Sequence, residues 1–190
     1  TSNQKALGNN VVFQLWNKDS ILYKKEMGDF NSKTQAPIAS CSKWLTAALV
    51  MIFVDEGKIS LDDPVVKYIP VFGNYFKNYI TIRQCLSHLI GIKSEERLFK
   101  RIMDRKKYSS LEDEVNSFAA KDIQSNAGTE FRYSEIGLNI AGRILEIVSK
   151  RRFDLLAKQK LFNSLGMRRT TFSTMDGSAV NPSGGAQSTP

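Results

Sequence analysis

The stretch Pro37-Ile38-Ala39-Ser40-Cys41-Ser42-Lys43 runs directly into Trp44–Val54, where every residue except Thr46 is apolar. A helix that is apolar on all sides is typical of a buried position, so the pattern predicts a central buried helix over about Ser40–Glu56. Gly57 follows where the helix would end. The apolar run is too short for a membrane-spanning helix, and no longer apolar run occurs elsewhere.

Ser40 and Lys43 are the first candidates for chemistry, because residues three positions apart lie on one face of a helix. A hydroxyl at a helix N-terminus lies near the positive end of the helix dipole, which favours developing negative charge. A lysine in mostly apolar surroundings can have its pKa lowered enough to accept a serine proton. Such a pair activates a nucleophile without a histidine. Ser42 is a rival serine, but adjacent residues of a helix do not face each other.

Taken alone, the Ser-x-x-Lys spacing is a weak signal, because a capping serine followed by a surface lysine produces it as well. The sequence before and after this pair predicts further secondary structure. Residues 11–16 and 21–30 read as strands around the turn-like run 17–20, which predicts a hairpin. Thr81 is placed to cap a short helix that ends at Leu86 or His88.

Further helical patterns follow in the second half of the chain, over residues 95–107, 111–120 and about 153–162. The clearest amphipathic helix runs from Ile136 to Val148, where apolar residues recur at helical spacing. Asn139, Arg143 and Glu146 are expected on its opposite, polar side.

Several motifs, in this order, together resemble the class C β-lactamase and penicillin-binding-protein family of serine hydrolases. They are the nucleophile run at 37–43, Asp55–Pro64 with Tyr68-Ile69-Pro70, Ile80–His88 followed by Gly91, Gly128–Ser134, Leu165-Gly166-Met167 with Thr170 or Thr171 and Phe172, and Gly184-Gly185 with Ser188-Thr189.

The resemblance implies that Ser40 is the acylated nucleophile and Lys43 its general base. It implies that Tyr133 moves the proton between the nucleophile and the leaving group, since a nearby lysine stabilises a phenolate. The alternative for Tyr133 is a half-buried aromatic residue with a locally bonded hydroxyl. The expected activity is hydrolysis of an ester or amide in a small-molecule or peptide acyl substrate, of the esterase, D-peptidase or carboxypeptidase, or β-lactamase type.

Two features depart from the family pattern. Glu135 stands where the family's Tyr-x-Asn motif has asparagine, and an ionised carboxylate only accepts hydrogen bonds where an amide also donates them. Glu135 is therefore a candidate substrate-binding residue with altered chemistry. The late-strand Lys-Thr-Gly or His-x-Gly motif is absent, and Lys33-Thr34-Gln35 precedes the nucleophile. These departures leave open a non-catalytic binding or structural member or fragment on the same fold.

The fold implied by the resemblance is α/β (α+β) and β-lactamase/transpeptidase-like, with an antiparallel sheet flanked by helices and a largely helical region. We expect residues 1–190 to be the N-terminal part of one such domain. Residues 1–57 would hold the first strands and the nucleophile helix, 58–175 the mostly helical region, and 176–190 a loop. The C-terminal strands would be missing or supplied by another chain.

Composition excludes several other classes. The formal net charge is +8, but the basic residues are dispersed, with no stripe or motif that would indicate nucleic-acid binding. Cys41 and Cys85 are too few for a disulfide scaffold and are expected to be buried apolar residues. His88 is the only histidine, so no zinc site or other cofactor is expected. Loop packing is the favoured role for His88 and a general base the alternative. No signal peptide is evident, and export to the periplasm or cell surface is implied only by the resemblance.

Overall fold

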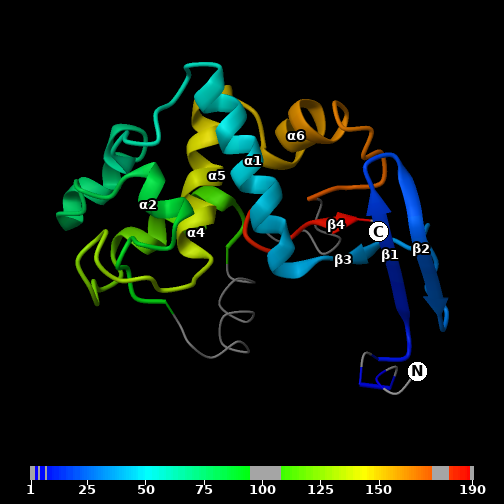
Figure 1. Ribbon diagram of the computed structural model, residues 1–190. Helices are drawn as coiled ribbons and strands as arrows, with labels where there is room; N and C mark the ends of the chain where they lie inside the picture. The colour runs from blue at the N-terminus through cyan, green and yellow to red at the C-terminus, as the bar shows by residue number, and fades with distance from the viewer. Residues whose placement is uncertain (1–2, 4, 7, 95–107, 173–179, 189–190) are drawn as a thin grey trace.

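The computed structural model describes residues 3, 5–6, 8–94, 108–172 and 180–188. Its helices gather into one body, and a long N-terminal hairpin projects from one side of this body (Figure 1). Antiparallel strands combined with helices agree with the predicted α/β class. None of the helices in these described ranges is both long enough and apolar enough to span a membrane.

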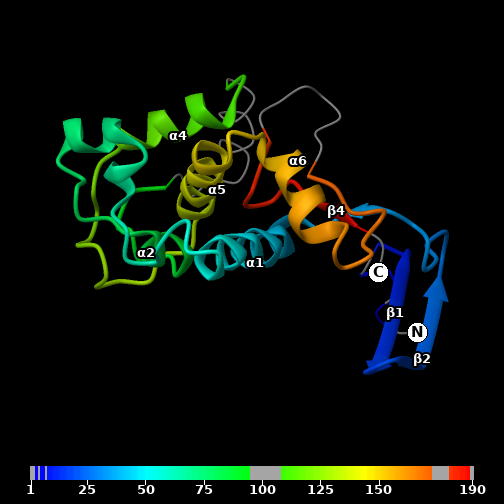
Figure 2. The same cartoon turned by 90° about the horizontal axis from the view of Figure 1, so that it is seen from above.

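Helix α1 (Ser42–Asp55) occupies the centre of the body and crosses α5 (Ile136–Ser149) (Figures 1 and 2). Its inner face carries Leu49, Val50 and Phe53, which are at most 1% exposed. The expectation that α1 is buried on all sides is wrong, because Trp44 is 84% exposed and Met51 40% exposed. An apolar sequence without periodicity does not reveal which side of a helix packs; here the Trp44 side lines an open cavity.

Helix α2 (Ile82–Leu86) begins with the cap that the sequence predicts. The Thr81 hydroxyl accepts a hydrogen bond from the Gln84 N–H, and the Gln84 side chain accepts one from the Thr81 N–H. This reciprocal pair satisfies donors that a helix N-terminus leaves unpaired. Helices α2 and α5 approach closely at Gly137, where an added Cβ would lie 2.2 Å from the Cys85 carbonyl oxygen. Glycine is therefore required at that position.

The remaining helices complete the core beneath α1 and α5. Helix α4 (Leu111–Ala119) begins at Ser110, whose hydroxyl accepts from the Asp113 N–H. Helix α6 (Phe153–Ala157) continues into the π-helical turn η4 (Lys158–Phe162), so the predicted helix over about 153–162 is confirmed with a change of pitch. The helix predicted over 95–107 lies outside the described residues.

Two small antiparallel sheets are described. Strands β1 (Val11–Asn17) and β2 (Ser20–Met27) form the predicted hairpin, with an irregularity between Leu15 and Trp16. Strands β3 (Ala36–Pro37) and β4 (Gln187–Ser188) form the second sheet, which pairs the segment before α1 with the last described residues. Large apolar side chains of the hairpin are 44–61% exposed, at Phe13, Leu15, Trp16, Ile21, Leu22 and Tyr23.

The two cysteines differ in their surroundings. Cys85 is fully buried, as expected, and burial raises the pKa of its thiol. The expectation that Cys41 is buried is wrong, because Cys41 is exposed in the short 3-10 helix η1 (Ala39–Cys41). Its neighbours Ser42 and Lys43 take the buried positions at the start of α1. Both cysteines are free thiols.

One carboxylate stabilises the turn before the 3-10 helix η2 (Val65–Lys67). Asp63 accepts hydrogen bonds from the Lys67 ammonium (2.8 Å), the Tyr68 hydroxyl (2.6 Å) and the Ser60 N–H (2.8 Å). These donors, chiefly Lys67, lower the pKa of Asp63 from 3.8 to about 2. The ionised carboxylate therefore stabilises the fold above pH 4, and this stabilisation is lost as pH falls toward 2.

We predict that Asp63→Asn lowers the free energy of unfolding by about 1–2 kcal/mol at pH 6, because hydrogen bonds to a charged group are lost. Urea titrations at pH 6 and pH 2.5 measure the effect, which should shrink at the lower pH because the Asp63 carboxyl of the unfolded chain is then protonated. Asp19→Asn, in the exposed hairpin turn, is the control. A loss for Asp63→Asn that is equal at both pH values would contradict the assignment.

Candidate active site

The start of α1 is held in place by a segment almost 150 residues away in the sequence. The Ser42 hydroxyl donates to the Ala39 carbonyl (2.5 Å) and accepts from the Ala186 N–H (2.9 Å). The Ile38 N–H donates to the Ala186 carbonyl (3.0 Å). Ala39 has a φ of 44°, in the left-handed region that few non-glycine residues adopt. The turn that presents Ser40 is thus specified by buried hydrogen bonds.

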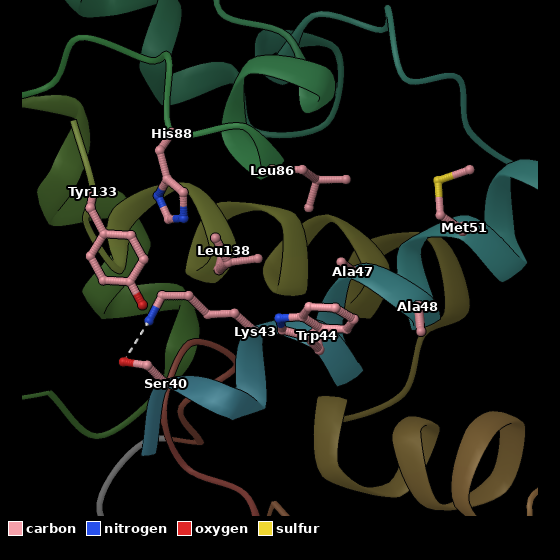
Figure 3. Close-up of a pocket in the computed structure, with 10 residues that line it drawn as sticks. All are labelled: Ser40, Lys43, Trp44, Ala47, Ala48, Met51, Leu86, His88, Tyr133 and Leu138. Atoms are coloured by element: carbon pink, nitrogen blue, oxygen red, sulfur yellow. Dashed lines mark hydrogen bonds between the residues drawn. The ribbon is translucent and has the colours of Figure 1, made fainter. Parts of the chain in front are cut away.

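Lys43 is the centre of the site and is only 9% exposed. Its Nζ donates to the Ser40 hydroxyl (3.3 Å) and to the Ser183 carbonyl (2.8 Å). The same nitrogen lies 4.8 Å from the centroid of the Tyr133 ring. Figure 3 shows the Tyr133 hydroxyl directed toward this nitrogen. The three residues that the sequence nominated for chemistry are therefore brought together around one amine.

Two further polar contacts connect α1 and α5 to the loop before β4, and sequence reasoning missed them. Thr46, the one polar residue in the apolar run, donates to the Pro182 carbonyl (2.5 Å). Asn139 is fully buried, and its Oδ1 accepts from the Ser183 N–H (3.2 Å). The expectation that Asn139 lies on the polar side of α5 is wrong, because this side chain turns inward to the Ser183 loop. Thr46 was the available sequence signal, since a lone polar residue in a buried run needs a partner.

A cavity opens beside the three nominated residues (Figure 3). At one end Ser40, Lys43, Tyr133 and His88 supply its polar groups. The rest of its wall is apolar and consists of Trp44, Ala47, Ala48, Met51, Leu86 and Leu138. This mixture, a few convergent polar groups against apolar walls, is typical of a site for a small organic ligand.

His88 lies in this wall, although the sequence favoured a loop-packing role for it. Its ring is partly buried and its centroid is 4.6 Å from that of Tyr133. Burial, and then the positive charge of Lys43, lower the pKa of the His88 imidazole. The Nδ1 atom accepts a hydrogen bond from the Ser134 N–H (3.3 Å).

Glu135 occupies the N-cap position of α5 and is partly buried. It is not among the described residues that line the cavity. Its assignment to substrate binding stays a prediction. Among the described side chains, no group of three or more histidine, cysteine or carboxylate residues is arranged to hold a metal ion.

The chain was compared with known protein families and structures. The model of the family named Beta-lactamase matches residues 7–188. The chain belongs to the Beta-lactamase family. A candidate β-lactamase from Bacteroides dorei DSM 17855 superposes with a TM-score of 0.80 and 30% identity, over 99% of this chain and 57% of that one. The predicted family and fold class are confirmed.

Two curated relatives agree with this assignment. Protein flp of Staphylococcus aureus strain MW2 is 28% identical over 142 residues, which is 73% of this chain and 28% of that protein. The human mitochondrial serine beta-lactamase-like protein LACTB is 33% identical over 108 residues, which is 52% of this chain and 19% of that protein. The chain therefore spans less than a third of the length of these two relatives.

The geometry separates the two serines of the nucleophile run, because Ser42 is fully buried and both of its hydrogen bonds go to backbone groups. We predict that Ser42→Ala lowers the free energy of unfolding by about 1–3 kcal/mol, since two buried backbone groups lose their partner. Urea titration measures this loss. Ser164→Ala, on an exposed serine, is the matched control and should change stability by less than about 0.5 kcal/mol. Equal stability of Ser42→Ala and wild type would contradict the structural role.

Proposed function

We propose that the protein is a serine hydrolase that forms an acyl-enzyme on Ser40 and hydrolyses an ester or amide bond. One observation carries the proposal: the Lys43 amine contacts the Ser40 hydroxyl, is anchored by the Ser183 carbonyl, and lies against the ring of Tyr133. The anchor occupies one N–H of the amine and so orients the nitrogen toward Ser40. A nucleophile and a base within hydrogen-bond reach, with the base oriented by a third group, is the arrangement that acyl transfer requires.

In the proposed acylation step, Lys43 first releases one proton to solvent, and the neutral amine then takes the Ser40 proton while Oγ bonds to the substrate's acyl carbon. The bond from that carbon to the leaving oxygen or nitrogen then breaks. The leaving group receives a proton from the Tyr133 phenol, which regains one from the Lys43 ammonium. Water then attacks the acyl carbon and gives its proton to the same pair, the bond from that carbon to Oγ breaks, and the pair returns the proton to Ser40 as the acid is released. Both steps conserve protons without a cofactor.

The complete site requires more than the described residues provide. We propose that the C-terminal strands of the family sheet, from the same protein or from another chain, pair with the hairpin and supply an oxyanion-hole amide. The exposed apolar side chains of β1 and β2 support this proposal, because large exposed apolar patches mark surfaces that another element covers. Loss of one oxyanion donor typically slows acyl transfer by about a hundredfold or more, so the chain without these strands would turn over slowly.

The substrate would be a small molecule or peptide with an apolar portion, since the cavity wall beyond Lys43 is apolar. Esters, D-amino-acid peptides and penicillins all present an acyl carbonyl of this kind. The family resemblance also favours a protein exported to the periplasm or cell surface.

Labelling of the full-length protein with a fluorophosphonate tests the proposal. We predict that the wild type gains the mass of one adduct on Ser40 and that Ser40→Ala gains none. Lys43→Met should slow labelling by about 10²–10⁴-fold, because the base is lost. Ser164→Ala and Tyr79→Phe, on exposed residues away from the cavity, are the controls. An unlabelled wild type would count against an enzyme.

A non-catalytic member of the family is the second candidate. Glu135 favours it, because its carboxylate replaces an amide that would donate to a substrate carbonyl. In that case Ser40→Ala would leave every measured activity of the full-length protein unchanged. Loss of ester hydrolysis in Ser40→Ala would exclude this candidate.

A further inference from the structure

His88 contacts all four residues of the segment 131–134, which presents Tyr133 to the site. Its carbonyl accepts from the Arg132 N–H (2.9 Å), and its Nδ1 accepts from the Ser134 N–H (3.3 Å). Its ring packs on the Tyr133 ring with 4.6 Å between centroids, and edge-on against Phe131 at 5.7 Å. His88 therefore contacts both the ring of Tyr133 and the backbone on either side of it.

The backbone of His88 adopts the conformation that makes this double contact possible. Its φ is 60°, in the left-handed region, which is unfavourable for a non-glycine residue. In this conformation the carbonyl and the side chain of one residue both reach the same facing segment. Backbone strain of this kind is retained where the surrounding contacts require it, and it gathers at functional sites.

The protonation state of His88 agrees with these contacts. Nδ1 can accept the Ser134 N–H only when the imidazole is neutral, with the remaining ring proton on Nε2. Burial and the charge of Lys43 act in this direction. Because Nδ1 already accepts the hydrogen bond from the Ser134 N–H, His88 is poorly placed to act as the general base. Any effect of His88 on the reaction would therefore come from its contacts with Tyr133.

We propose that His88 is a positioning residue that fixes the phenol of Tyr133 against Lys43, so that proton transfer to the leaving group occurs from a held geometry. The inference rests on the proposed function and deepens it. His88 donates no proton to the substrate in this scheme. Its contribution is that the Tyr133 side chain, which is 51% exposed, does not have to be ordered during each turnover.

Two substitutions separate the two kinds of contact. His88→Phe keeps a ring against Tyr133 and loses the acceptor for the Ser134 N–H. His88→Asn loses the ring, keeps an acceptor, and tolerates the left-handed backbone. Each is combined with Tyr133→Phe, and Tyr79→Phe is the matched control for that change. Thermal unfolding is measured for every variant to show that it is folded. If His88→Phe does not fold, the kinetic comparison is made with His88→Asn alone.

The measurement is the hydrolysis of two esters with the same acyl group, one with a p-nitrophenolate leaving group and one with an alkoxide leaving group. An alkoxide leaves only with a proton, whereas p-nitrophenolate leaves without one. We expect His88→Phe to lower kcat for the alkyl ester by about 10–100-fold and for the p-nitrophenyl ester by less than about threefold, with KM little changed. His88→Asn should recover part of the loss. In the Tyr133→Phe background, substitution of His88 should add no further loss.

Equal losses on both esters, or losses that multiply in the double variant, would overturn the positioning role, because a general packing defect has those signatures. Wild-type rates in both His88 variants would overturn it as well. Either result leaves the labelling of Ser40 intact, so the proposed function survives. The proposed function is overturned if the wild-type protein neither hydrolyses the esters nor takes the fluorophosphonate label. In that case the positioning role of His88 is overturned as well.

Discussion

The hydrogen bond from the Lys43 amine to the Ser183 carbonyl is the contact on which the rest of the site depends. An amine this deeply buried costs several kcal/mol unless its donors find partners, so the Ser183 loop has to be in place before Lys43 can point at Ser40. The loop is secured in turn by Thr46, through the Pro182 carbonyl, and by Asn139. Ser40, Lys43 and the Ser183 loop are therefore linked by one set of buried contacts.

The two halves of the site are held in different ways. On the α1 side, buried hydrogen bonds to the segment before β4 specify the turn at Ser40. On the other side, Tyr133 is half exposed. His88 contacts its ring and accepts hydrogen bonds from the backbone N–H groups on either side of it. The Ser40 side is thus fixed by contacts with a distant segment, whereas the placement of Tyr133 depends in part on local contacts with His88.

Sequence reasoning predicted the local features of this protein well. The Thr81 cap, the hairpin and the amphipathic helix α5 all follow from nearby residues. The spacing of Ser40 and Lys43 placed both on one helix face, and the family resemblance added Tyr133. The failures at Cys41, Asn139 and Trp44 share a cause, because each depends on what a distant segment does. Periodicity describes the faces of a helix, whereas the Ser183 loop and the open cavity decide which faces are buried.

The long separation between Lys43 and Ser183 has a consequence for how the site is made. The two residues are 140 positions apart, so their contact is non-local and forms only after most of the chain has folded. At ribosomal rates of about 5–20 residues per second, roughly 7–28 seconds pass between the synthesis of the two residues. During this interval Lys43 lacks its anchor beside Ser40. Under the proposed function, the nascent chain would therefore be unreactive, and Ser40 would gain its base only when this contact forms.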